Sequence, residues 1–137
     1  MAKSLLYRLF GAGKIPATYA SQLQTEGVVL MDEGLKASVT YLDFRRPGKY
    51  SSWQRQWFAG SIALTKVRLL ALRGQNPLID IPLTDARLHQ LRYSLEGDET
   101  LCVAFDPALF HVDWSGTIEY RFRTELAGQL IQLLQPK

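Results

Sequence analysis

The stretch GSIALTKVRLLALRG, residues 60–74, decides how the rest of the chain is interpreted. Most of it is apolar and typical of a β-sheet, but Lys66 and Arg68 place two positive charges near its middle. A single strand of about 12 apolar residues would be long, whereas two shorter strands are ordinary. We therefore predict a hairpin that turns over residues 65–68. Thr65 and Arg68 are interpreted as structural residues of this hairpin, with Arg68 held by backbone carbonyls or an acidic side chain.

The rest of the chain, from Glu26 onwards, alternates between apolar runs and turn residues. Alternation with a period of two and enrichment in β-branched and aromatic residues are typical of strands. The segment RRPGKYSSWQRQ is interpreted as a long loop that contains a tight turn at Pro47-Gly48. The predicted strands are GVVLM (closed by a turn at DEG), LKASVTYLDF, FAGSIALT, RLLALR, PLIDIPL (an edge strand between two prolines), RLHQLRYSL, ETLCVAF and TIEYRFR.

Helices are predicted at the two ends of the sequence. Pro16 fits the first turn of a helix, and an earlier short helix would place Leu5, Leu6, Leu9 and Phe10 on one side. Near the other end, Thr124 can act as an N-cap, with Glu125 in the first turn. The leucines of this last helix share one face at helical spacing, so the helix must dock: Leu126, Leu130, Leu133 and Leu134. We predict a helical extension over residues 1–25 and a mainly β domain over residues 26–137.

Composition indicates an ordinary globular protein. The 137 residues are 47% hydrophobic and 21% charged, which fits one domain with a core of its own. The only cysteine, Cys102, rules out an internal disulfide. We expect a cytoplasmic protein because the first residues lack a signal-peptide core and no run of about 20 apolar residues is present.

Positive charge is concentrated in one part of the sequence. Residues 36–73 contain eight Lys and Arg residues and one acid, Asp43, so this block carries +7 within a net charge of +3. Such an uneven distribution can favour an acidic partner, although clustering in sequence need not mean clustering in space.

Seven strands from Leu35 onwards, followed by one amphipathic helix, resemble the pleckstrin-homology (PH) superfold. The text GSIALTKVRLLAL resembles a hairpin of the bacterial PH-like and GRAM-like families, and EGVVLMDEG and PGKY occupy the places of a lead-in strand and a Pro-Gly loop. This resemblance implies a seven-stranded antiparallel barrel or split sheet, capped by the C-terminal helix. It also implies a binding module, since the loop after the first strand often binds phosphoinositide head groups in PH domains.

The segment from Arg45 to Trp57 holds the candidate binding residues. Guanidinium and ammonium groups bind phosphate, and aromatic rings favour both membrane interfaces and protein interfaces. The family pattern has a basic-x-basic triplet on the second strand, but Arg55-Gln56-Trp57 supplies only its first member. Two hypotheses follow: protein–protein or self-association, with Arg55 stacked between two tryptophans, or peripheral binding to anionic lipid at the inner face of a membrane. The candidates are Arg45, Arg46, Lys49, Tyr50, Trp53, Arg55 and Trp57.

Catalysis is not expected. His89 and His111 lack the spacing of metal ligands or of a nucleophile and its base, and His89 is interpreted as a partly buried structural residue. Cys102 lies opposite the apolar face of its strand and is interpreted as passive. We expect no metal and no cofactor, and we rank a small-molecule enzyme and a nucleic-acid-binding protein behind the two binding hypotheses.

Overall fold

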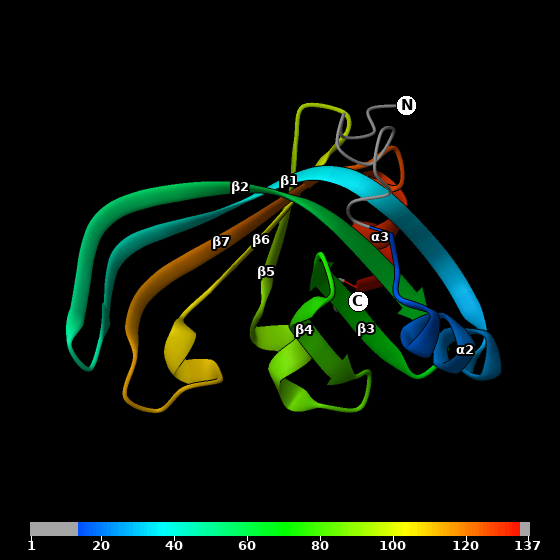
Figure 1. The fold of residues 1–137 in the computed structure, drawn as a ribbon, viewed down its shortest axis with the longest axis horizontal. Helices are drawn as coiled ribbons and strands as arrows, with labels where there is room; N and C mark the ends of the chain where they lie inside the picture. Colours follow the sequence, from blue (N-terminus) through cyan, green and yellow to red (C-terminus); the bar gives the residue numbers. More distant parts are fainter. Residues whose placement is uncertain (1–13, 135–137) are drawn as a thin grey trace.

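The computed structural model describes residues 14–134, and seven antiparallel strands dominate it (Figure 1). All seven belong to one sheet, whose strands are hydrogen-bonded in the order β4-β3-β2-β1-β7-β6-β5. The predicted mainly β fold with a C-terminal helix is confirmed. The elements are α2 (Ala17–Glu26), β1 (Val28–Arg46), β2 (Lys49–Thr65), β3 (Arg68–Arg73), β4 (Asn76–Pro82), the 3₁₀ helices η1 (Ala86–Gln90) and η2 (Pro107–Leu109), β5 (Arg92–Glu96), β6 (Thr100–Phe105), β7 (Ser115–Arg123) and α3 (Ala127–Leu134).

The first two strands are much longer than the sequence predicted. DEG is not a turn, because β1 continues through it with a register shift between Asp32 and Leu35. Gly34 has a φ of 68°, which allows an extra residue to be absorbed as a bulge while the chain keeps its direction. The lead-in strand and the strand after it are therefore one strand.

The predicted long loop RRPGKYSSWQRQ is also wrong, because these residues form the end of β1, a turn and the start of β2. Only Pro47 and Gly48 lie outside the strands, and Arg46 pairs directly with Lys49. Gly48 supplies the positive φ, 79°, that such a tight turn needs. The polar sequence was misleading because most side chains of this hairpin are exposed, so no buried face imposes an apolar alternation.

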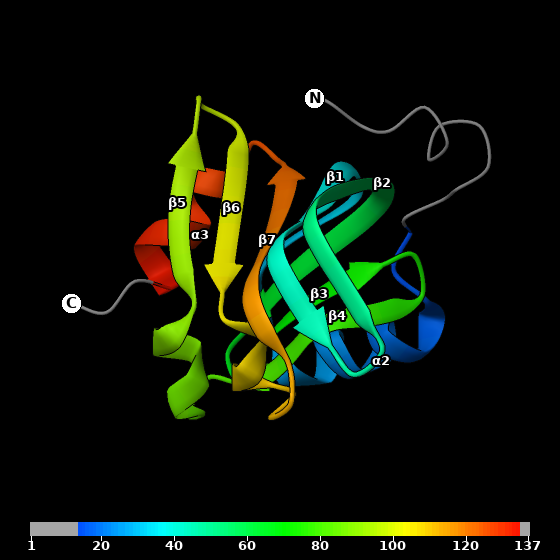
Figure 2. The same cartoon turned by 90° about the vertical axis from the view of Figure 1, so that its left-hand side faces the viewer.

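The sheet curls around one main core that α3 closes on one side (Figure 2). Alternate residues of β7 confirm the predicted pattern, since Ile118, Tyr120 and Phe122 are buried. In α3, Leu130 and Leu134 enter the same core, whereas Leu133 is 56% exposed. The helix begins at Ala127, later than predicted, and Thr124 caps the turn before it by accepting a hydrogen bond from the Leu126 amide.

The predicted hairpin at residues 65–68 is confirmed, since β2 ends at Thr65 and β3 begins at Arg68. The PLIDIPL segment is an edge strand, as predicted, because β4 ends the sheet. RLHQ, however, is the 3₁₀ helix η1 instead of a strand, with the Asp85 carboxylate accepting from the Arg87 amide. As a result His89 is exposed, and the prediction that it is partly buried is wrong.

Helix α2 confirms the prediction of a helix that follows Pro16. The earlier helix, with Leu5, Leu6, Leu9 and Phe10, falls outside the described residues. α2 covers part of the sheet's outer face, which points away from the main core. There Ile15 and Leu23 pack against a second apolar cluster formed by Ala63, Leu70 and Leu72. Within residues 14–134, the outer face is thus covered over β2 and β3, and no described helix covers it elsewhere on β2, β1, β7 and β6.

Candidate functional site

The candidate residues 45–57 divide into two groups along the β1–β2 hairpin. Arg45, Arg46, Lys49 and Tyr50 lie at its tip, next to the turn. Trp53, Arg55 and Trp57 follow on β2 at every second position, and all three are exposed. At about 3.3 Å per residue, the eight residues from Lys49 to Trp57 span roughly 26 Å. Trp57 is therefore far from the hairpin tip, whereas Trp53, four residues from Lys49, lies between them.

The tryptophans belong to a stacked row that we call the ladder: Lys36, Trp57, Arg55 and Trp53. The Arg55 guanidinium carbon lies 5.4 Å from the centre of the Trp53 ring and 6.0 Å from that of Trp57. The Lys36 Nζ lies 5.9 Å from the centre of the Trp57 ring. Arg55 Nε also donates to Thr40 Oγ1 at 2.9 Å, which fixes the row to β1. The two indoles are 59% and 62% exposed, so they are held in place without being buried.

At the hairpin tip, arginines stack on neighbouring rings. The Arg45 guanidinium carbon lies 4.8 Å from the centre of the Tyr50 ring, and that of Arg46 lies 5.6 Å from Trp114. Arg46 and Lys49 line a cavity of about 270 Å³ that also reaches Trp114 and the start of β4. The tip is thus a small basic and aromatic surface beside the loop before β7.

A groove of about 540 Å³ lies beside the ladder on the outer face; we call it the outer groove. Trp57 and Lys36 border it on one side, and the turn between β5 and β6 borders it on the other. Its middle is Arg121, whose Nε donates to Glu96 Oε1 at 2.8 Å and whose Nη1 donates to Glu119 at 2.9 Å. The hydrogen bond from Arg121 lowers the pKa of Glu96, so this pair stays ionised at neutral pH.

The floor of the outer groove contains a buried hydroxyl group. Ser38 pairs with Trp57 on β2 and with Arg121 on β7, and these large side chains leave it 0% exposed. Among the described residues its Oγ has no hydrogen-bond partner. Sequence analysis did not identify this groove, because its residues come from β1, β2, β7 and the β5–β6 turn. The alternation of Arg121 and Arg123 was visible, but their neighbours depend on strand order.

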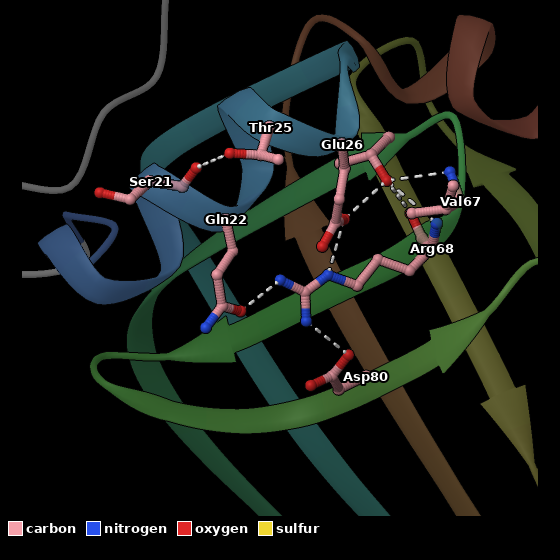
Figure 3. Close-up of polar contacts among 8 residues, drawn as sticks. Ser21, Gln22, Thr25, Glu26, Val67, Arg68 and Asp80 are labelled. Atoms are coloured by element: carbon pink, nitrogen blue, oxygen red, sulfur yellow. Dashed lines mark hydrogen bonds and ion pairs between the residues drawn. The ribbon is translucent and has the colours of Figure 1, made fainter.

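Arg68 connects Gln22 and Glu26 of α2 to the sheet (Figure 3), and Thr65 also contacts Glu26. Thr65 Oγ1 accepts from the amides of Val67 and Arg68 at 3.1 and 3.0 Å and donates to Glu26 at 3.0 Å. The Arg68 guanidinium donates to Glu26 at 2.9 Å, to Asp80 at 3.1 Å and to a third oxygen, on Gln22, at 2.9 Å. The two charges that interrupt the opening stretch therefore differ: Lys66 is exposed, and Arg68 is an internal clamp.

Removing this clamp should weaken the docking of α2. We expect Arg68→Ala to lower the free energy of unfolding by about 1–3 kcal/mol, because Glu26 and Asp80 lose a charged hydrogen-bond donor. Arg68→Lys should recover only part of this loss, since an ammonium group cannot span three oxygens in the guanidinium geometry. Urea unfolding would measure both variants. Arg92→Ala, an exposed arginine on β5, is the control; equal effects of Arg68→Ala and Arg92→Ala would contradict the clamp.

The residues considered for catalysis are dispersed. His89 is exposed on η1, and His111 stacks on Trp114 with ring centres 3.8 Å apart. Cys102 is 4% exposed, and its burial raises the pKa of the thiol, which disfavours the reactive thiolate. Within residues 14–134, no three His, Cys, Asp or Glu side chains gather in a way that could hold a metal ion.

Comparisons with known proteins add no assignment. No protein-family model matches the chain, and a search of curated proteins finds no significant match. Among the described residues, no helix is both long and apolar enough to cross a membrane.

Proposed function

We propose that this chain is a non-catalytic association module of PH-like architecture, which binds protein through the uncovered part of its outer sheet face. The observation that carries this proposal is the ladder. Two tryptophans about 60% exposed are unusual on a sheet, and Trp and Arg are the residue types most enriched at the energetic centres of protein interfaces. The seven strands followed by a docked helix support the PH-like part of the proposal.

The ladder is also prepared for binding. The cation–π contacts of Trp57 with Lys36 and Arg55, and the hydrogen bond from Arg55 to Thr40, restrict these side chains before a partner arrives. Association then costs less side-chain entropy than it would for free side chains. Each indole offers about 100–150 Å² of exposed surface. At about 25 cal/mol per Å², burying this surface would contribute roughly 2.5–4 kcal/mol per tryptophan.

Binding to anionic lipid through the hairpin tip is the second candidate. Arg46 and Lys49 share a cavity with Trp114, and Val112 in the neighbouring loop is 95% exposed. Each basic residue near an anionic surface contributes about 1 kcal/mol, and salt screens this attraction. Because the tip has three cations and two of them already stack on protein rings, we rank it below the ladder.

A photo-crosslinking residue on the ladder tests the proposal. We expect p-benzoylphenylalanine in place of Trp53, with Trp57 intact, to form protein adducts when cells that express the chain are irradiated. The same probe in place of Leu133, which is similarly exposed on α3, is the control and should form far fewer adducts. The proposed function would be lipid binding instead of protein association if the ladder probe forms no adducts and the wild-type chain binds liposomes in a way that Arg46→Gln/Lys49→Gln abolishes.

A further inference from the structure

The outer groove carries opposite charges on its two sides. Lys36 on β1 and Arg123 on β7 form a basic strip, and both side chains are exposed. Asp98 and Glu99 lie on the other side of β7, in the turn between β5 and β6, next to Thr100, which pairs with Arg123. None of these four side chains makes an ion pair with another of the residues 14–134, although the acid beside them, Glu96, is paired with Arg121. The groove therefore presents a charge dipole with both ends available.

The two sides also differ in shape. In Figure 1 the β5–β6 turn projects beyond β1, at the top of the view. The basic strip lies on the neighbouring strands β1 and β7, and Trp57 is next to it on β2. One face thus combines a projecting acidic turn with a basic part of the groove that Trp57 borders. The acidic turn of a second copy could fit into that basic part.

We propose that two copies of this chain associate through the outer groove about a two-fold axis. Each copy places its turn with Asp98 and Glu99 against Lys36 and Arg123 of the other, and each Trp57 ring, at the basic border of the groove, packs beside the turn of the other copy. A two-fold rotation brings the same patch of both copies together and reverses the direction of the dipole, so each acidic side meets a basic side. This inference rests on the proposed association function and names its partner.

The size of the face sets the expected strength. The face crosses β2, β1, β7, β6 and β5, which is about 19 Å at roughly 4.8 Å per strand spacing. The run from Trp53 to Ala59 along β2 is about 20 Å long at roughly 3.3 Å per residue. These dimensions give a face of roughly 400 Å² per copy, below the roughly 800 Å² per partner of standard specific interfaces, so the dimer should be weak, with a Kd on the order of 1–100 µM. Much of the attraction is between exposed charges, so salt should weaken the dimer.

A charge-swap experiment on the purified full chain tests the geometry. Lys36→Glu/Arg123→Glu makes both sides of the groove acidic, and Asp98→Lys/Glu99→Lys makes both sides basic. Each variant alone should dimerise at least tenfold more weakly than the wild type, because every contact occurs twice and becomes repulsive. An equimolar mixture of the two should recover a dimer, since an all-acidic groove then faces an all-basic one. Sedimentation equilibrium measures all four samples, and far-UV circular dichroism checks that both variants fold.

Each outcome decides a particular claim. A wild-type chain that is monomeric at several hundred micromolar overturns the two-fold dimer. The proposed association function would still stand if the Trp53 probe captures a different protein in cells. A wild-type dimer that both charge-reversed variants retain, or a mixture that stays monomeric, shows that the outer groove is not the interface. Recovery of the dimer only in the mixture supports the inference, because no other pairing of the variants joins opposite charges.

Discussion

Replacing Leu130 by alanine is expected to lower the free energy of unfolding by about 2–5 kcal/mol. Leu130 lies in the middle of α3, is 1% exposed and packs in the main core inside the curled sheet. The loss has two parts. One is the burial free energy of the methyl groups that are removed, and the other is the cost of the cavity that remains because the helix and sheet cannot close around it. Urea unfolding of the two proteins, followed by tryptophan fluorescence, measures it.

Leu133→Ala provides a matched control on the same helix. Leu133 is 56% exposed, so the same chemical change removes little packing and should alter stability by no more than about 0.5 kcal/mol. Helix propensity changes equally in both variants, which isolates the effect of burial. Similar losses for Leu130→Ala and Leu133→Ala would mean that α3 does not dock with the face seen here.

Gly116→Ala is expected to be comparably damaging for a backbone reason. Gly116, the second residue of β7, has a φ of 104°, and an added Cβ would lie 2.4 Å from the carbonyl oxygen of Asp43 and 2.7 Å from that of Leu42. These are backbone atoms of β1, so they cannot move away as a flexible side chain could. Backbone strain of about 1–3 kcal/mol and overpacking of about 1–3 kcal/mol should together cost at least about 2 kcal/mol.

Gly97→Ala separates these two contributions. Gly97 in the β5–β6 turn also has a positive φ, 61°, but an added Cβ would have nothing within 4 Å. Its substitution should therefore cost only the left-handed strain, about 1–2 kcal/mol. If thermal or urea unfolding gives Gly116→Ala and Gly97→Ala the same loss, the close approach of β7 to β1 does not constrain the fold.

Sequence patterns predicted elements best where one face is buried. β7 and α3 each bury one face in the core. Their buried residues, such as Phe122 and Leu130, therefore recur with the period of a strand and of a helix. The β1–β2 hairpin has no such asymmetry near its tip, and its polar, glycine-containing sequence resembled a loop. Local composition could not show that Arg45 and Tyr50 face each other, since strand pairing is a property of two segments.

The candidate site was predictable to the same extent. The spacing of Trp53, Arg55 and Trp57 along one strand was enough to hypothesise an arginine between two tryptophans, because alternate residues share a face. The structure has this arrangement, and it adds Lys36 at the end of the row. Lys36 and the outer groove could not be predicted, because they require the register of β1 against both β2 and β7.

That double pairing of β1 also governs the order in which the chain can fold during synthesis. One edge of β1 pairs with β2 almost as soon as both have left the ribosome, but the other edge waits for β7, so that Ala37 meets Phe122 near the end of the chain. Until then the free edge of a long strand is exposed and can pair with neighbouring chains. Contacts of such long sequence separation also slow folding. A nascent or truncated chain that lacks β7 and α3 should therefore depend on chaperones or aggregate, whereas the 137-residue chain pairs this edge of β1 with β7.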